Sequence, residues 1–194
     1  MKRSLSILAL AVAAACAPAL AQAQTSVIRA VASGPAESPP NGSPGSSVAT
    51  FTLDGDIMTA DVPFQDLLTG TTMAHIHCCT TAAFTGVAPI AIPFTDFPLG
   101  VTSGSYSASF DLSDATIYDP AFLAAFGGTP ASAGAALIDA IASNEAYLNI
   151  HTARYPAGEI RGFLVAAPIP EPATWGMLGM GLAGLGMMAR RRRA

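Results

Sequence analysis

The chain is 194 residues long, 51% hydrophobic and only 11% charged, with a formal net charge of −4. All thirteen acidic residues lie between Glu37 and Glu171, and between the two basic ends of the chain only Arg29, Arg154 and Arg161 balance them. The middle of the chain is therefore strongly acidic. Because such a surface repels nucleic acid and anionic lipid, we expect neither as a partner of this part.

The first 23 residues have the pattern of a signal peptide. The basic pair Lys2-Arg3 precedes an apolar run, Leu5–Cys16, and small residues at 19–23 offer cleavage sites. We therefore expect a signal helix at 1–23 and a mature chain that begins at residue 22 or 24. A retained membrane anchor and, through Cys16, a lipoprotein are the alternatives that the residues leave open.

Residues 24–166 are long enough for one domain with one core, and their pattern is that of a β protein. After an irregular start at 33–47, short β-branched and aromatic runs alternate with turns rich in Gly, Pro and Asp. The expected strands are Val48–Leu53, Ile57–Phe64, Thr71–His77, Val87–Pro93, Ser105–Leu112, Tyr147–Thr152 and Glu159–Val165.

Two alanine-rich segments interrupt the strands. Pro120–Phe126 and Ser132–Ser143 carry apolar residues at helical spacing and are separated by Gly127-Gly128. We therefore predict a mainly β fold with a short helical insertion. Its strand pattern favours a Greek-key β-sandwich or barrel, immunoglobulin-like or superoxide-dismutase-like.

The three histidines of the chain all lie on two of the expected strands. Residues two apart on a strand point to the same face, so His75 and His77 project together, away from Ala74 and Ile76. On the later strand, His151 lies opposite the aliphatic face. If the two strands are neighbours, the three imidazoles meet on one face of the sheet.

Three neutral imidazoles are a ligand set for zinc or copper. We therefore predict a metal site formed by His75, His77 and His151. Hydrogen bonds to loops that cover this face are the alternative role for the same side chains. A concentration of every histidine on two strands keeps both explanations open.

Sulfur atoms lie close to these histidines in the sequence. Met73, Cys78 and Cys79 are soft ligands that suit copper, although Met73 also fits a packing role. Because the two cysteines are adjacent and the compartment permits oxidation, three states remain open: a vicinal disulfide, two free thiols, or a contribution to a soft-metal site.

Two charged residues flank Ile160. Glu159 and Arg161 share a strand face, and we expect an ion pair between them or between Arg161 and Glu37. On the surface such a pair contributes about 0–1 kcal/mol to stability.

Residues 167–194 have the order of a sorting tail. A polar motif precedes 17 uncharged residues, 173–189, which as a helix span roughly 25 Å, enough to cross a thin hydrocarbon core. Four arginines then stop the translocation of the chain across the membrane and stay in the cytoplasm. The motif is Pro170, Glu171 and Pro172, and the basic end is Arg190, Arg191, Arg192 and Arg193.

This tail resembles the PEP-CTERM sorting signal of Gram-negative bacteria. The resemblance implies an exported protein, held transiently in the inner membrane by a transmembrane helix. An exosortase-type membrane protease would then cut near the motif and release the protein to the cell surface or beyond. An exopolysaccharide or another surface matrix is the expected surrounding.

Four motifs of the domain resemble the CHRD domain, first named from chordin, over residues 27–166. They are Gly34-x-x-Glu37-x-Pro39-Pro40, His75-Ile76-His77, Tyr147-Leu148-Asn149-Ile150-His151-Thr152 and Gly158-Glu159-Ile160-Arg161-Gly162. The resemblance implies a secreted protein whose function is undetermined, and in chordin such domains belong to an extracellular binding protein. The alanine-rich segment and the cysteine pair depart from the usual pattern.

The histidines also resemble the copper site of copper–zinc superoxide dismutase. The chain lacks a full set of zinc ligands and the bridging histidine, so dismutation is not implied. No serine or cysteine stands in a recognisable relation to a base. We therefore expect a non-enzymatic binding or structural module, with a copper or zinc site of possible redox use as the alternative function.

Overall fold

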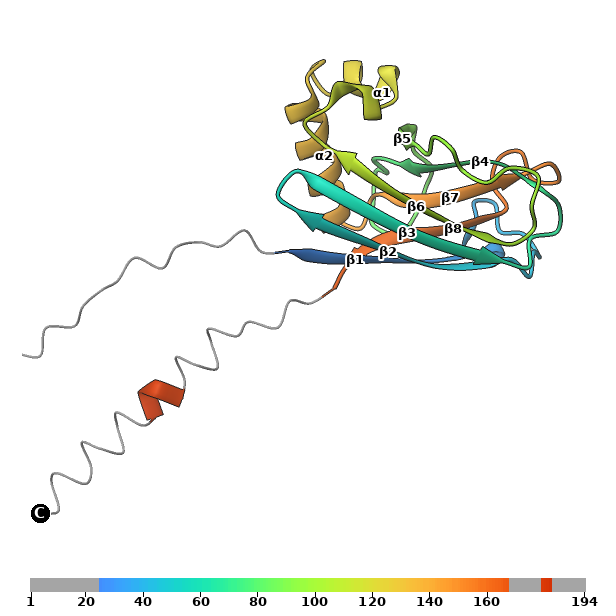
Figure 1. The fold of residues 1–194 in the computed structure, drawn as a ribbon, viewed down its shortest axis with the longest axis horizontal. Coiled ribbons are helices and arrows are strands. Elements are labelled where there is room, and N and C mark those ends of the chain that lie inside the picture. Colours follow the sequence, from blue (N-terminus) through green and yellow to red (C-terminus); the bar gives the residue numbers. More distant parts are fainter. Residues whose placement is uncertain (1–24, 168–178, 183–194) are drawn as a thin grey trace, which may run out of the picture.

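A computed structural model describes residues 25–167 and 179–182 of the chain (Figure 1). The expected signal peptide, the sorting motif at 170–172 and the four arginines at 190–193 lie outside these residues. Within the described residues, no helix is long and apolar enough to span a membrane. The expected transmembrane helix at 173–189 falls mostly outside them, and the four residues from 179 to 182 are helical.

Eight antiparallel strands form one continuous sheet in the order β5-β4-β7-β8-β1-β2-β3-β6. The strands are β1 Ser26–Ser33, β2 Ser46–Asp54, β3 Ile57–Gln65, β4 Thr71–His77, β5 Ile90–Pro93, β6 Gly104–Asp111, β7 Tyr147–Thr152 and β8 Ile160–Ala166. Short 3-10 turns occupy Gly34–Ala36 (η1) and Ala115–Ile117 (η2).

The sheet curls until its two edges approach each other. Phe94 directly follows edge strand β5, yet its ring lies 4.8 Å from Tyr106 and 5.6 Å from Phe110 on the opposite edge strand, β6. Aromatic packing therefore bridges the two edges of the sheet. The expected mainly β fold is confirmed, but as one curled sheet rather than two stacked sheets.

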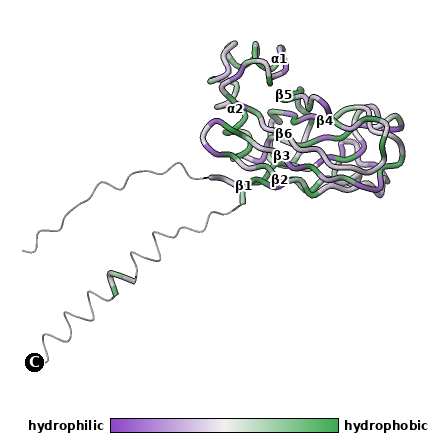
Figure 2. The backbone as a smooth tube through the Cα atoms, viewed as in Figure 1, coloured by the Kyte–Doolittle hydropathy of each residue, from purple (hydrophilic) through white to green (hydrophobic). Residues whose placement is uncertain are grey.

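The core fills the inner face of this curl. Along β1, β2, β3 and β6, every second residue is buried or partly buried, as Met58, Ala60 and Val62 on β3 show. Figure 2 shows hydrophobic and hydrophilic stretches alternating along the chain. All eight strands contribute side chains to this one core. A substitution in one strand therefore affects how the neighbouring strands pack.

Two helices cover one end of the sheet (Figure 1). They are α1 Pro120–Ala125 and α2 Pro130–Ala142, each with Pro at its first position and an N-terminal cap from the preceding side chain, Asp119 or Thr129. The stripe of Leu137 and Ile141 on α2 is buried in the core. The predicted helical insertion is thus confirmed.

Strand β7 is buried on both faces, unlike most of the sheet. Leu148 and Ile150 face the core, and Tyr147, Asn149 and His151 face the outside, where loops cover them. An outer face that is polar and still buried needs specific partners for its side chains. The outer face of β7 is therefore the candidate for a functional site.

Strand β1 is a finding that sequence analysis did not anticipate. It pairs with β2 on one side and with the last strand, β8, on the other. The pair Ile28 and Ala166 brings the two ends of the domain side by side, and Ala167 N–H donates to Val27 O at 2.7 Å. The central pair of the sheet thus joins the first and the last strand.

Close backbone approach between β1 and β8 makes Gly162 a sensitive position. A Cβ atom there would lie against the backbone of Val31 and Ala32. We predict that Gly162→Ala lowers the free energy of unfolding by about 1–3 kcal/mol, because the strands must move apart. Chemical denaturation measures the change. Gly42→Ala is the control, since a Cβ there has nothing within 4 Å, and an equal loss in both variants would contradict the prediction.

Candidate metal centre

Strands β4 and β7 are direct neighbours and place all three histidines on one face. In the register of this pair, Met73 lies opposite His151 and His75 lies opposite Asn149. His77 follows on the same face of β4. All three imidazoles are almost fully buried, with exposures of 6% for His75, 9% for His77 and 6% for His151. The predicted convergence is therefore observed.

The ring nitrogens lie close enough for a shared ion. One ring nitrogen from each histidine falls within 4.8 Å of the others, and His75 Nδ1 is 3.3 Å from His151 Nε2. Two nitrogens bound to one tetrahedral metal at 2.0–2.1 Å are roughly 3.3 Å apart. One pair already has this spacing, and the third ring must move closer by up to about 1.5 Å.

Backbone carbonyls fix the tautomers of two rings. His77 Nδ1 lies 2.8 Å from Ala88 O, and His151 Nδ1 lies 2.9 Å from Pro156 O. Because a carbonyl only accepts, both Nδ1 atoms must carry the proton, which leaves each Nε2 with a free lone pair. A carbonyl behind a histidine is the usual support of a metal-binding imidazole.

The free lone pairs point to a shared centre. His77 Nε2 is buried without a hydrogen-bond partner, an arrangement that costs free energy unless something binds there. His151 Nε2 faces His75 Nδ1. The set of three imidazoles suits zinc or copper, and it contains no carboxylate of the kind that calcium or magnesium requires.

The imidazoles are held in the form that binds metals. Burial, followed by the neighbouring His151 and His77, lowers the pKa of His75 to about 4. Burial likewise lowers the pKa of His77 and of His151 below the ordinary value. At neutral pH all three rings are therefore uncharged, and protons do not compete for their lone pairs.

Arg161 holds two loops over this face. Its Nη1 donates to Gly86 O at 2.7 Å and its Nε donates to Ala36 O, so it ties loop 78–89 to η1. The guanidinium also lies 5.1 Å above the ring of Tyr147. Tyr147 in turn stacks on His77 at 4.8 Å with an angle of 3° between the rings. The orientation of His77 thus depends on a chain of stacked groups.

Glu159 connects the other loops. Its side chain is 0% exposed and accepts hydrogen bonds from Ser43 Oγ at 2.5 Å, Leu68 N–H at 2.7 Å and Thr152 Oγ1 at 2.5 Å. The expected surface ion pair between Glu159 and Arg161 is wrong, because both residues are buried and bond to different partners. Hydroxyl and amide donors, rather than a cation, satisfy the Glu159 carboxylate.

Glu37 and Asn149 form a second buried polar pair beside the histidines. Glu37 Oε1 and Asn149 Oδ1 lack hydrogen-bond partners, and a Cβ atom at Gly158 would lie 2.7 and 2.5 Å from them. Burial raises the pKa of Glu37 to about 7, although nearby Arg161 acts in the opposite direction. Glycine at position 158, with a φ of +129°, leaves the room that both side chains occupy.

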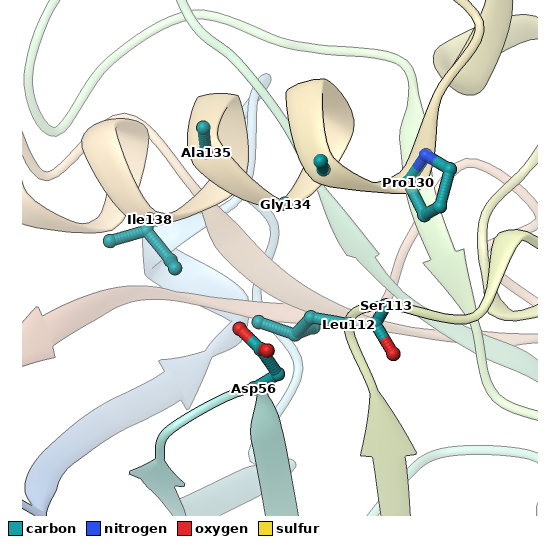
Figure 3. A pocket seen from close by; sticks show the side chains of 8 residues that line it. Asp56, Leu112, Ser113, Pro130, Gly134, Ala135 and Ile138 are labelled. Atoms are coloured by element: carbon teal, nitrogen blue, oxygen red, sulfur yellow. The ribbon is translucent and has the colours of Figure 1, made fainter. Parts of the chain in front are cut away.

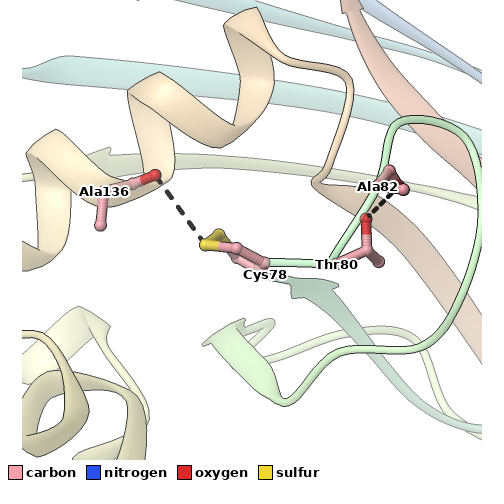
Figure 4. Close-up of a disulfide and its surroundings, with 5 residues drawn as sticks. Cys78, Thr80, Ala82 and Ala136 are labelled. Carbon is pink, nitrogen blue, oxygen red and sulfur yellow. Dashed lines mark hydrogen bonds between the residues drawn. A yellow bond between two sulfur atoms is a disulfide. The ribbon is translucent and has the colours of Figure 1, made fainter.

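The cysteines do not join the histidines. Cys78 and Cys79 form a disulfide, and Cys78 is fully buried in the core. Cys79 Sγ lies 3.9 Å from Ala136 O on α2 (Figure 4). Since Cys78 follows His77 on the strand, it points to the opposite face. Of the three states left open by the sequence, the disulfide is the one observed, and the soft-metal contribution is excluded.

The pocket beneath α2 differs from the histidine cluster in its lining (Figure 3). Its lining includes Leu112, Gly134 and Ile138, and its one charged side chain is Asp56. It contains none of the predicted ligands. Among the described residues, the histidine cluster therefore offers the more specific chemistry.

The sequence pattern predicted the clustering of the three histidines and missed most of the groups that support them. Glu37, Tyr147 and Asn149 were visible in the motifs, but nothing in the sequence showed that loops would bury them. The carbonyls of Ala88 and Pro156 carry no sequence signal, because every residue has one. The predicted sorting residues, Pro170 to Pro172 and Arg190 to Arg193, lie outside the described part of the chain.

Comparisons with known families agree with the organisation of the chain. The CHRD domain matches residues 28–164, and the PEP-CTERM protein-sorting motif matches residues 168–193. No curated protein and no solved structure matches the chain. The first match covers nearly all of the curled sheet and its helices, and the second begins just after β8.

The raised pKa of Glu37 predicts a pH-dependent stability. Between about pH 4.5 and 7 the folded protein keeps this proton and the unfolded chain loses it, so the contribution of Glu37 to stability falls as pH rises. Glu37→Gln removes the ionisation and keeps the shape. We predict that the variant gains up to about 3 kcal/mol relative to wild type across this window, as measured by denaturant unfolding. A difference that is independent of pH would contradict this.

Proposed function

Because the chain belongs to the CHRD domain family and ends in a PEP-CTERM sorting motif, we propose that it is a non-enzymatic module displayed at the cell surface or in its matrix. The sorting motif indicates export and processing of the tail by an exosortase, which is a membrane protease. Binding or structural support is the proposed role of the domain after release.

The arrangement of the chain supports this proposal. The CHRD match ends at residue 164 and the sorting match begins at 168, so only residues 165–167 separate the two. Both cysteines of the domain are tied in a disulfide, which leaves no thiol nucleophile there. An exopolysaccharide or another matrix polymer is the proposed surrounding in which the domain is retained.

The mass of the exported protein tests the processing step. We expect the released form to lack the basic end, because cleavage near Pro170–Pro172 separates it from the domain. Intact-mass spectrometry of the protein from the medium or the cell surface measures this. A released form that still carries Arg190–Arg193 would contradict the proposal.

A variant of the motif gives the matched test. Pro170→Ala/Glu171→Ala/Pro172→Ala is expected to keep the full mass and to stay in the membrane fraction. Pro44→Ala changes an exposed proline outside the matched segment 168–193 and is expected to be processed as wild type. If the triple variant is released as efficiently as the control, the motif does not direct the cleavage.

A second candidate function is metal binding by His75, His77 and His151. The observation that favours it is the cluster of three buried, neutral imidazoles whose nitrogens lie within 4.8 Å, with one Nε2 left without a partner. This function is compatible with display, since a surface domain meets metal ions in its surroundings. Zinc and copper are the ions that the ligand set suits.

Metal titration tests the second candidate. We expect the full chain, purified in detergent, to bind one equivalent of Zn²⁺ or copper. We also expect His75→Ala/His77→Ala/His151→Ala to lose that binding. Because the pKa of each ring is lowered, binding should persist at pH 6, below the ordinary pKa of imidazole. Isothermal titration calorimetry at pH 6 and 7.5 measures both effects.

Exposed acids provide the control for unspecific uptake. Asp54→Asn/Asp61→Asn removes two exposed carboxylates of β2 and β3 and is expected to bind as wild type. Equal uptake by the triple histidine variant and the wild type would refute the histidine site.

A further inference from the structure

The geometry points to Cu(I) as the metal of the histidine cluster, with the thioether of Met73 as its fourth ligand. This inference rests on the second candidate function, because it names the ion and completes the ligand set of the same site. It adds a residue that neither the histidine spacing nor the family match assigns.

Met73 lies at the rim of the cluster. It is on β4, two residues before His75 and on the same face, and in the strand register it stands directly opposite His151. Side chains directly opposite each other in an antiparallel pair have Cβ atoms about 4.5–5.5 Å apart. The thioether therefore starts from a position beside the ring whose Nε2 faces the shared centre.

Packing does not account for Met73. Its side chain is 46% exposed, whereas Met58 on β3 is 1% exposed and belongs to the core. The rest of the outer face of β4 and β7 is covered by loops, so this methionine occupies the open side of a largely closed cluster. An unbranched side chain with three rotatable bonds is able to swing from this rim over the imidazoles.

The donor set selects the ion. Thioether sulfur is a soft ligand that favours Cu(I), whereas zinc sites are built from imidazole, thiolate and carboxylate. The cluster supplies three imidazoles, and the only thiols of the described domain are locked in the disulfide on the opposite face. Three nitrogens and one thioether therefore give a site that holds Cu(I) more tightly than an all-nitrogen site does.

Solvent access agrees with this role. The three rings are at most 9% exposed, and Met73 is the exposed neighbour on their face. An ion that enters from solvent meets the thioether before it reaches the buried nitrogens. The methionine thus serves as the entry ligand and then as the closing ligand of the site.

Removal of the sulfur tests the inference. We expect Met73→Leu in the full chain, purified in detergent, to weaken Cu(I) binding by about tenfold or more, with Zn²⁺ affinity changed less than about twofold. Competition with a chromophoric Cu(I) chelator, in anaerobic buffer with ascorbate, measures the first affinity. Competition with a zinc-responsive dye measures the second. Leucine keeps the apolar volume, so the fold is retained.

Met180→Leu is the matched control. Met180 is 67% exposed in the short helical stretch of the tail, so its replacement removes an exposed thioether away from the sheet. It is expected to bind both ions as wild type. X-ray absorption of the Cu(I)-loaded wild type should show a sulfur neighbour that Met73→Leu lacks.

The outcomes separate this inference from the function on which it rests. If Met73→Leu binds Cu(I) as wild type while the triple histidine variant loses it, the thioether ligand is refuted and the histidine site stands. If the triple histidine variant binds Cu(I) and Zn²⁺ as wild type, both are refuted. A sulfur neighbour that persists in Met73→Leu would also overturn the assignment.

Discussion

The buried carboxylate of Glu159 is the interaction on which the rest of the site depends. It accepts hydrogen bonds from Ser43, Leu68 and Thr152, which belong to three segments that are far apart in the sequence. A fully buried carboxyl group is stable only when hydrogen-bond partners surround it, so the three segments must be held together at this point. Loop 153–158, held between Thr152 and Glu159, carries the carbonyl that sets the tautomer of His151.

The outer face of β7 shows how burial and chemistry are connected here. Loops exclude water from His77 and His151, and this exclusion lowers the pKa of both rings and keeps them neutral. The same loops supply the carbonyls that orient the rings. Arg161 binds two of the covering segments through their carbonyls, and its charge also acts on the nearby Glu37 carboxyl.

Parts of this structure were predictable because they depend on local pattern alone. Strand β4, Thr71–His77, and strand β7, Tyr147–Thr152, have the expected bounds, since alternating side chains define a strand face. Strand β5 begins at Ile90 instead of Val87, because the carbonyls of Ala88 and Pro89 bond to His77 and to Cys78 N–H. Alternation also fails to tell one curled sheet from two stacked sheets, because both bury one side of every strand. Only the long-range pairing of β1 with β8 decides between them.

That pairing also sets where the tail leaves the domain. Strand β8 starts beside the part of β7 that carries His151, and it ends at Ala166, where the tail begins. Its seven residues carry the chain roughly 20 Å from one end of the sheet to the other. The tail therefore leaves the domain at the end of β8 that lies away from the histidine cluster. Processing of the tail, which the sorting motif indicates, therefore leaves the contacts of the buried cluster unchanged.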